Sequence, residues 1–154
     1  MEANFRPATA RDADALLPMI RALCEQDGTP FDETKVRRAL AEILADERYG
    51  RVWLVEWDGE PAGYLVLTFG FSLEFGGRDA FIDELYVREG FRGRGLGRRA
   101  IERAERACRE RGVSALHLEV ERANTAAQEL YRRSGFRDHD RYLMTKRIEQ
   151  RDEG

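Results

Sequence analysis

The segment from Arg92 to Gly97 constrains this chain most strongly, because it places three glycines at alternate positions between an apolar strand and an amphipathic helix. Strand-forming residues run from Ala80 to Val87, and apolar residues recur at helical spacing from about Gly95 to Arg111. Glycines at such a junction let backbone N–H groups converge on an anion, beside the positive end of the helix dipole. The sequence therefore predicts an anion-binding loop at this point of the fold.

The residues around this loop favour phosphate as the anion. Arginines adjoin the glycines on both sides, and guanidinium groups match phosphate oxygens in charge and in geometry. The glycines follow the pattern Gly-x-Gly-x-Gly, which differs from the dinucleotide fingerprint Gly-x-Gly-x-x-Gly, and no Gly-Lys-Ser or Gly-Lys-Thr of a P-loop is present. A diphosphate is the expected guest, and the plain structural alternative is a solvated turn before an arginine-rich helix.

The composition is that of an ordinary globular domain and narrows the classes of partner. The chain has 154 residues, 36% of them charged, and a formal net charge of −3. Acidic residues are interleaved with the arginines, which disfavours nucleic acid as a partner. The longest apolar runs fall far short of the roughly 18 residues of a membrane span, and the first residues do not resemble a signal peptide. We expect one domain over residues 1–154, located in the cytoplasm, with neither a nucleic-acid nor a membrane partner.

Three residues of types that often form disulfides, bind metals or act in catalysis are better explained here as structural residues. Cys24 and Cys108 lie among apolar residues at helical spacing, which favours reduced core cysteines over a disulfide or a metal site. His117 is the only histidine near the loop and the helices around it, and a satisfied structural histidine is the favoured interpretation. No metal is expected.

Periodicity along the whole chain predicts an α/β (α+β) domain. The N-terminal part reads as two helices and a β-hairpin, and the C-terminal part alternates strands with helices. In chain order the expected elements are a short extended piece at Phe5, a helix capped by Thr9 and kinked or split at Pro18, a helix over 32–45, strands over 51–57 and 61–71 joined by a turn at 58–59, a strand over 80–87, a helix over 95–111, a strand over 115–120, a short helix from Asn124 or Thr125 to Ser134, and closing strands at Phe136 and over 142–148.

Two motifs resemble those of a known family. Arg92-x-x-Gly95-x-Gly97 is similar to the Gln/Arg-x-x-Gly-x-Gly/Ala signature of the GNAT acyltransferases, and residues 82–87 look like the strand that precedes it in that family. Downstream, Asn124 is followed seven residues later by Tyr131, which resembles the closing motif of the family. By this resemblance, firmest from about 81 to 136, the chain is identified as a GNAT superfamily N-acetyltransferase, similar to small-amine and protein N-terminal acetyltransferases.

The resemblance implies a GNAT fold, with a mixed central sheet of six to seven strands, about four flanking helices, and a splay between the strands at 80–87 and 115–120. The pantetheine of acetyl-coenzyme A (acetyl-CoA) would enter the splay, where the backbone of Leu85 and Val87 would pair with its amides. The loop would hold its pyrophosphate. The cofactor-binding residues implied in this way are Leu85, Tyr86, Val87, Arg92, Gly93, Arg94, Gly95, Leu96, Gly97, Arg98, Asn124 and Tyr131.

Transfer of an acetyl group to an amine needs a base and a group that stabilises the departing thiolate. By the resemblance, Tyr131 is the candidate hydrogen-bond donor to the thiolate, and an amphipathic core tyrosine is the alternative. The candidate bases are Glu84, which leads, Asp83 and Glu119; for each, a solvated strand residue is the alternative, and a water chain could replace them all. Strand alternation would put Asp83 and Glu84 on opposite faces.

The expected function is acetyl-CoA-dependent N-acetylation of a primary amine, by direct attack in a ternary complex. Acidic groups near the thioester would favour a cationic acceptor. A noncatalytic acyl-CoA-binding sensor or interaction module would present the same loop and is the alternative. We expect the acceptor pocket from the helix pair and the stretch 70–77. A protruding strand could pair between chains, so a homodimer is compatible with the sequence.

Overall fold

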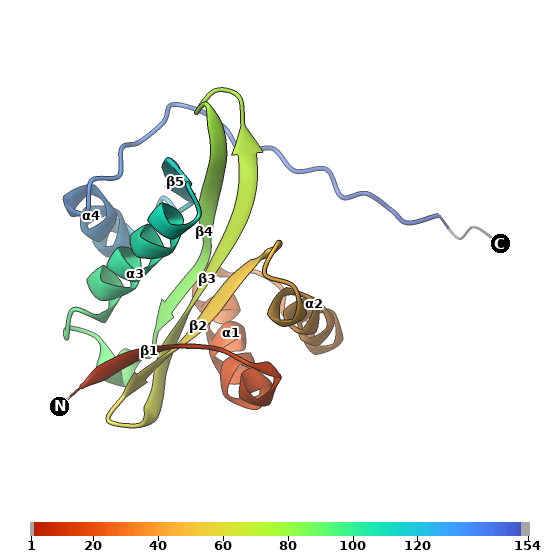
Figure 1. The fold of residues 1–154 in the computed structure, drawn as a ribbon. Helices are drawn as coiled ribbons and strands as arrows, with labels where there is room; N and C mark the ends of the chain where they lie inside the picture. The colour runs from red at the N-terminus through yellow and green to blue at the C-terminus, as the bar shows by residue number, and fades with distance from the viewer. Residues whose placement is uncertain (1, 152–154) are drawn as a thin grey trace.

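A five-stranded mixed sheet forms the centre of the protein, whose computed structural model describes residues 2–151 (Figure 1). Neighbouring strands from β1 to β4 are antiparallel, whereas β5 lies parallel to β4 after a helical crossover. The predicted hairpin turn is confirmed, because Asp58 and Gly59 connect two strands with φ values of 49° and 82°. In their order across the sheet, which is also chain order, the strands are β1 (Ala3–Pro7), β2 (Gly50–Trp57), β3 (Glu60–Ser72), β4 (Gly77–Val87) and β5 (Ala115–Leu118).

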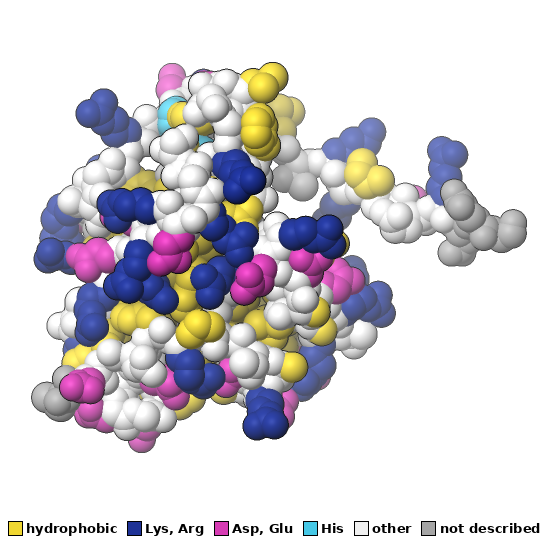
Figure 2. Space-filling model, viewed as in Figure 1, with side chains coloured by type: hydrophobic (Ala, Val, Ile, Leu, Met, Phe, Trp, Pro, Cys, Tyr) yellow, Lys and Arg dark blue, Asp and Glu magenta, His cyan; other side chains and the backbone are white. Residues whose placement is uncertain are grey.

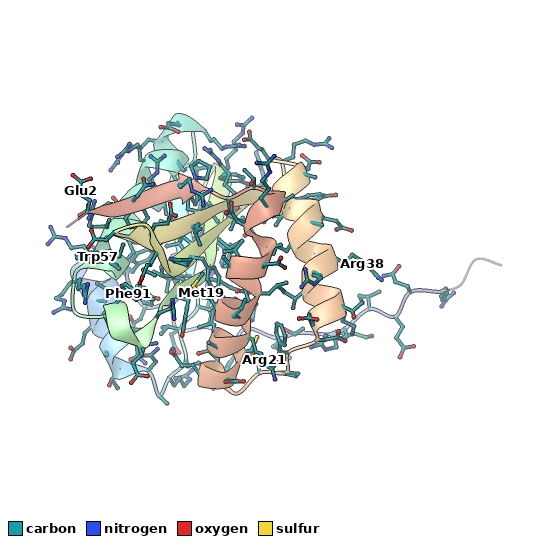
Figure 3. All side chains as sticks on the ribbon, turned by 90° about the horizontal axis from the view of Figure 1, so that it is seen from below. Glu2, Met19, Arg21, Arg38, Trp57 and Phe91 are labelled. Atoms are coloured by element: carbon teal, nitrogen blue, oxygen red, sulfur yellow. The ribbon has the colours of Figure 1, made fainter. Side chains whose placement is uncertain are left out.

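Helices cover both faces of this sheet. In chain order they are η1 (Ala10–Asp12), α1 (Ala13–Asp27), α2 (Glu33–Ala45), η2 (Glu89–Phe91), α3 (Leu96–Glu110) and α4 (Thr125–Arg133). Helices α1 and α2 lie on one face, and α3 and α4 lie on the other (Figure 1). Figure 3 views the α1–α2 layer, with Met19 on the sheet side of α1 and Arg38 on the far side of α2. The predicted helix pair and the four main helices are confirmed.

An ion pair fixes the start of the first helical segment. Asp12 accepts hydrogen bonds from both terminal nitrogens of Arg6, at 2.9 and 3.0 Å, and from the backbone N–H of Thr9 at 2.7 Å. The Arg6 guanidinium is the main reason that the pKa of Asp12 lies below its usual value. Helix α1 then runs from Ala13 to Asp27 without a break at Pro18, so the expected division of this helix does not occur.

Two apolar cores fill the space on either side of the sheet. One packs α1 and α2 against the sheet and contains the buried residues Leu16, Leu54 and Tyr64. The other packs α3 against the sheet around Trp53 and Leu65, and its helical members recur every three or four residues as Ala100, Ile101, Ala104, Ala107 and Cys108. Small alanines on α3 let the helix lie close to the strands. Cys108 is a buried free thiol, as predicted, whereas the free thiol of Cys24 is only partly buried.

The sheet has fewer strands than the predicted six to seven, because the two closing strands are wrong. Residues 136–151 carry neither helix nor strand, and the chain there leaves the domain as an extended arm (Figure 1). A strand requires a hydrogen-bonded neighbour. The first part of this segment contacts the β3–β4 turn through side chains, by His139 with Phe75 and Arg141 with Glu74, without pairing to the sheet. Strand β5 also ends at Leu118 rather than at residue 120, since its partner β4 diverges beyond that point.

Two features of the described residues concern membranes and metals: the length and apolar character of the helices, and the grouping of metal-ligating side chains. None of the helices within residues 2–151 combines the length and the apolar character of a membrane span. Over the same residues, no group of three or more His, Cys, Asp and Glu side chains is placed to hold a metal ion.

Truncating the α3 contact with the sheet should destabilise the whole domain. Ile101 is 1% exposed, and we expect Ile101→Ala to lower the free energy of unfolding by about 2 to 5 kcal/mol, because it removes buried methyl groups and leaves a cavity. Urea unfolding followed by circular dichroism measures the change. The matched control is Leu73→Ala, which should change the free energy by less than about 0.5 kcal/mol, because Leu73 is 90% exposed. Equal losses in the two variants would contradict this description of the core.

Candidate active site

The sheet opens between β4 and β5, as the family resemblance implied. The two strands pair in parallel from Asp79 with Ala115 to Ile82 with Leu118, where β5 ends. Strand β4 continues alone on that side to Val87, still paired with β3 on its other edge. We call the separation of residues 83–87 from the chain after Leu118 the sheet opening.

Backbone groups of β4 face this opening. Arg88 donates its backbone N–H to the carbonyl of Ala62 on β3, at 2.8 Å. Successive residues of a strand direct their backbone groups to opposite edges, so Leu85 and Val87 direct theirs away from β3 and toward the opening. The side chain of Arg92 donates from Nε to the carbonyl of Val87 at 2.9 Å. The N–H of Val87 and both backbone groups of Leu85 are then directed at the opening.

The predicted anion-binding loop lies at the end of β4, between η2 and α3. Gly93 and Gly95 have φ values of 78° and 76°, a conformation that side chains rarely adopt, and Gly95 is the N-terminal cap of α3. The first N–H groups of α3 have no acceptor within the helix itself, so they point past Gly95 into the loop. Both glycines are exposed, and the loop has the backbone form that the sequence predicted.

Gly97 serves a different purpose from the other two glycines. It lies in the first turn of α3, where a Cβ atom would come within 3.0 Å of Leu130 Cδ2 on α4. The absence of a side chain at this position therefore brings α3 and α4 together. The sequence pattern contained this residue but did not distinguish packing from anion binding.

The arginine side chains of the loop already make some contacts within the protein. Arg92 donates to Val87 and, through its second terminal nitrogen, to Gln26 Oε1 at 2.9 Å, so it ties the loop to the end of α1. The guanidinium of Arg94 lies 4.8 Å from the ring centre of Trp57, and Arg98 pairs with Glu102 at 3.3 Å. All three side chains remain exposed. Figure 2 shows Lys and Arg side chains gathered over the α3 region of this face.

Glu84 is a partly buried carboxylate in the middle of β4. Tyr64, which is fully buried on β3, donates its hydroxyl to Glu84 Oε1 at 2.6 Å. Burial is the main cause that raises the pKa of Glu84, and the charges of Asp83 and Asp27 raise it further against the lowering effect of the Tyr64 bond. A carboxylate with a raised pKa is a stronger base at neutral pH. The sequence did not single out Tyr64, because a buried strand tyrosine looks like any core residue.

Asp83 lies at a β-bulge that the sequence did not predict. Val66 pairs with Glu84 and the next residue, Leu67, pairs with Ile82, so Asp83 is the extra residue on β4. Ile82 and Leu85 both pack toward α3. The bulge interrupts the alternation, so the expectation that Asp83 and Glu84 point to opposite faces does not hold. Desolvation raises the pKa of Asp83 as well, although solvent reaches its side chain.

Tyr131 on α4 is half-buried and shares an acidic neighbour with Glu84. Its ring packs edge-on against Phe136, with centroids 5.9 Å apart. Burial raises the pKa of Tyr131, and the charge of Asp27 adds to the effect. The charge of Asp27 also raises the pKa of Glu84, so the end of α1 is near enough to act electrostatically on both side chains. A phenol with a raised pKa keeps its proton at neutral pH and can donate a hydrogen bond.

Asp27 is the residue that sequence reasoning missed. It is the last residue of α1, directly before the cap Gly28, so its position reads as an ordinary helix end. Burial, followed by the charge of Glu121, raises the pKa of Asp27. Only the folded chain brings these acids together, since they lie about a hundred residues apart in sequence.

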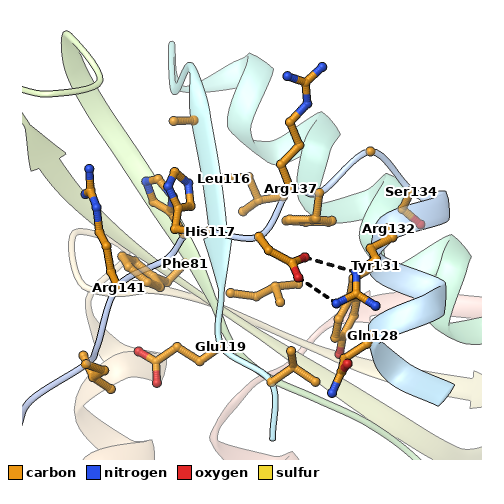
Figure 4. A pocket seen from close by; sticks show the side chains of 18 of the residues that line it. Phe81, Leu116, His117, Glu119, Gln128, Tyr131, Arg132, Ser134, Arg137 and Arg141 are labelled. Atoms are coloured by element: carbon orange, nitrogen blue, oxygen red, sulfur yellow. Dashed lines mark hydrogen bonds and ion pairs between the residues drawn. The ribbon is translucent and has the colours of Figure 1, made fainter. Parts of the chain in front are cut away.

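Glu119 and Asn124 lie at the other boundary of the opening. Glu119 follows the last residue of β5, is exposed, and points to the side of β5 opposite Tyr131 (Figure 4). Asn124 is the N-terminal cap of α4, as predicted, and its Oδ1 accepts the N–H of Ala127 at 3.1 Å. Its side-chain oxygen is therefore committed to the helix.

His117 has the surroundings of a structural histidine. Its Nε2 lies 3.2 Å from Asp79 Oδ2, and its ring packs between Phe75 and Phe81 with centroid distances of 4.6 and 4.9 Å. These contacts lie where β4 and β5 still pair, so this histidine strengthens the closed part of the sheet. The stretch 70–77, expected to help form the acceptor pocket, is also at this end of β4.

The mixed sheet opens beside a glycine-arginine loop, and a partly buried carboxylate and phenol lie near the opening. This is the arrangement of an α/β acyltransferase. The chain belongs to the Acetyltransferase (GNAT) family, whose model matches residues 17–136. The predicted family and fold are confirmed, and the chain is a GNAT-family N-acetyltransferase.

Individual relatives agree with this assignment. The chain is 28% identical to a thialysine N-epsilon-acetyltransferase of Bos taurus, over 87% of this chain and 84% of that protein. It is 35% identical to a streptothricin acetyltransferase of Streptomyces lavendulae, over 86% and 80% of the two chains. A solved structure of an integron cassette protein from the mobile metagenome of Cole Harbour Salt Marsh matches with a TM-score of 0.83 and 31% identity, over 96% of this chain and 91% of that one.

Neutralising Glu84 should stabilise the fold at neutral pH. Its folded-state pKa is raised above the ordinary value of 4.5, so the stability that the neutral acid provides is complete below pH 4.5 and is lost as the pH rises through the raised pKa. Glu84→Gln stays neutral and can still accept the Tyr64 hydroxyl. We expect this variant to unfold at higher urea concentration than the wild type at neutral pH.

The difference in urea midpoint between the two proteins should shrink as the pH falls through the raised pKa of Glu84, and should be smallest below pH 4.5, where both side chains are neutral. Comparison of the two urea midpoints at each pH cancels the contribution of other titrating groups. A difference that stays constant with pH would show that ionisation of Glu84 does not oppose folding.

Proposed function

We propose that this protein transfers the acetyl group of acetyl-CoA to the primary amine of a cationic acceptor, by direct attack in a ternary complex. The observation that carries the proposal is the sheet opening, where β4 continues beyond its last pair with β5 and the backbone groups of Leu85 and Val87 are directed away from β3. The pantetheine amides would pair with this backbone edge, and the pyrophosphate would bind at Gly93 to Gly95. Bound in this way, the thioester would lie deeper in the opening than the phosphates.

Glu84 is the proposed base. An amine with a pKa near 10.4 is protonated at neutral pH, and presenting it as the free amine costs about 4 to 5 kcal/mol. Glu84 has a raised pKa, and the Tyr64 hydroxyl engages one of its oxygens. The other oxygen can take the amine proton, directly or through a water, as the nitrogen attacks the thioester carbonyl carbon.

Tyr131 is the proposed donor to the leaving group. As the C–N bond forms and the C–S bond breaks, negative charge develops on sulfur, and a hydroxyl that donates a hydrogen bond stabilises it. A phenol is a weaker acid than a thiol, and burial weakens Tyr131 further by raising its pKa. The thiolate is thus stabilised by the hydrogen bond, without complete proton transfer.

The charges of the site favour a cationic acceptor. Asp27 acts electrostatically on both Glu84 and Tyr131, and Glu121 acts on Asp27. A region of such acidity attracts an ammonium group and repels an anion. The two relatives named above carry the names of thialysine and streptothricin as the molecules they acetylate, so both molecules belong in a panel of acceptors.

Release of coenzyme A in the presence of an amine tests the proposal directly. The full chain is incubated with acetyl-CoA and, separately, with diamines, thialysine, streptothricin, aminoglycosides and peptides, and free thiol is measured with a colorimetric reagent. Amine-dependent thiol release establishes the transferase activity. Tight binding of acetyl-CoA without release across the panel would instead support the noncatalytic binding module.

Removal of the Tyr131 hydroxyl should slow turnover. We expect Tyr131→Phe to lower kcat by about 10²-fold with little change in KM for acetyl-CoA, because the lost hydrogen bond forms as charge develops on sulfur. Tyr49→Phe is the matched control, since Tyr49 is a tyrosine with 59% exposure outside the site. Full turnover by Tyr131→Phe with an unchanged pH profile would exclude this role.

The three candidate carboxylates should differ in their effect on activity. Glu84→Gln should lower kcat/KM by about 10²-fold, whereas Asp83→Asn and Glu119→Gln should have smaller effects, because both side chains are exposed. Wild-type activity should decline as the pH falls through the raised pKa of Glu84. Near-normal rates in all three variants would indicate a water chain in place of a single base.

A further inference from the structure

The side chain of Arg92 makes three contacts around the end of β4. Its Nε donates to the carbonyl of Val87 at 2.9 Å, and a terminal nitrogen donates to Gln26 Oε1, also at 2.9 Å. Its guanidinium carbon lies 5.8 Å from the ring centre of Tyr86. The side chain therefore extends from the anion-binding loop across the edge of β4 to the last turn of α1. We call this set of contacts the Arg92 bridge.

The Arg92 bridge occupies a backbone group at the sheet opening. The N–H of Arg88 is directed at β3, so the carbonyl of the same peptide group, that of Val87, is directed at the opening. The guanidinium of Arg92 stands on this side of the carbonyl. A pantetheine amide that pairs with the backbone of Val87 must therefore compete with Arg92 for this oxygen.

Both hydrogen-bond partners of Arg92 are neutral. Val87 provides a backbone carbonyl and Gln26 an amide oxygen, and no carboxylate within residues 2–151 forms a salt bridge with Arg92. A guanidinium binds phosphate oxygens more strongly than neutral oxygens, because both partners are then charged. A diphosphate bound at the loop would thus draw Arg92 away from its two present partners.

The end of α1 stabilises the bridge while no phosphate is bound. The C-terminal end of a helix carries a partial negative charge that favours a cation, and the last turn of α1 contains no basic residue of its own. Arg92 brings a positive charge to this turn from the loop. Gln26 is exposed on the same turn, and its side-chain oxygen holds the guanidinium there.

We propose that the Arg92 bridge makes the protein select acyl donors that carry a diphosphate, with Arg92 as the specificity-determining residue and Gln26 as the residue that positions it. The proposal rests on the function proposed above. A donor must break the bridge to reach the Val87 carbonyl, and its apparent affinity falls to the extent that the bridge is formed. Coenzyme A recovers this loss, since its pyrophosphate binds the freed guanidinium. Pantetheine alone does not.

Binding of pantetheine tests the role of Gln26, because pantetheine has the amide groups of the donor but neither phosphate nor charge. Its dissociation constant is measured by chemical-shift titration of the full chain. We expect Gln26→Met, which removes the accepting oxygen, to bind pantetheine about threefold more tightly than the wild type. Gln26→Glu should bind it about threefold more weakly, because a carboxylate holds Arg92 more firmly.

The matched control is Glu25→Gln, since Glu25 is the exposed neighbour of Gln26 and pairs with Arg21 instead. This variant should bind pantetheine as the wild type does. A contact that only supports the structure would give the opposite sign for Gln26→Met, because its loss would weaken binding.

Arg92→Met separates the two effects of the guanidinium. Loss of the bridge should strengthen pantetheine binding about threefold. Loss of the phosphate partner should weaken the binding of coenzyme A, measured by calorimetry, by about tenfold. The two ligands should therefore respond to this substitution with opposite signs.

Equal pantetheine affinities in the wild type, Gln26→Met and Arg92→Met, or weaker pantetheine binding by Arg92→Met, would overturn the role of the bridge. If the wild type still binds coenzyme A, the proposed function is unaffected by that result. A wild type that binds no coenzyme A would instead contradict the proposed function, and the role of the bridge with it. All of these measurements are made without acetyl transfer.

Discussion

Strands β4 and β5 pair in parallel over four residue positions and then part, and the candidate site depends on the place where this pairing stops. Where the two strands pair, the Asp79–His117 contact and the packing of His117 against Phe75 and Phe81 strengthen the pairing. After Ile82, β4 pairs with β3 alone. A backbone N–H or C=O group that is shielded from water and lacks a hydrogen-bond partner lowers the stability by about 1 to 3 kcal/mol. The strand edge at Leu85 therefore favours a ligand with amide groups. The Arg92 side chain already occupies the Val87 carbonyl, which shows how readily this edge accepts a donor.

The two faces of the sheet differ in charge at the opening. On the α3 face, glycines with positive φ, the helix N-terminus and exposed arginines provide positive potential for phosphates. On the α1 face, Asp27 and Glu84 provide negative potential for an ammonium group. A donor with an anionic tail and an acceptor with a cationic head would therefore be favoured on opposite faces. This separation follows from the crossover connection, which places α3 and α1 on opposite faces of the same sheet (Figure 1).

The sequence predicted the features that local rules determine. The loop at Gly93 to Gly95, the hairpin at Asp58 and the four helices follow from residue spacing and turn chemistry. The mixed sheet that brings β5 beside β4 was implied by the family resemblance. Features that depend on tertiary contacts were missed. Asp27 joins Glu84 only through the packing of α1 on β4, the bulge at Asp83 leaves no local signal, and Gly97 serves helix packing inside an anion-binding motif. The closing strands failed because the composition of a segment cannot specify a hydrogen-bonded neighbour, and residues 136–151 form no strand in the structure.

A crystal structure of the protein with coenzyme A tests the central claim most directly, since it locates the ligand without any assumption about the acceptor. We expect the pantetheine to lie between β4 and β5 with its amides paired to the backbone of Leu85 and Val87, and the pyrophosphate to contact the N–H groups around Gly93 and Gly95. Coenzyme A bound away from the backbone of Leu85 and Val87, or a pyrophosphate that makes no contact with the loop, would contradict it.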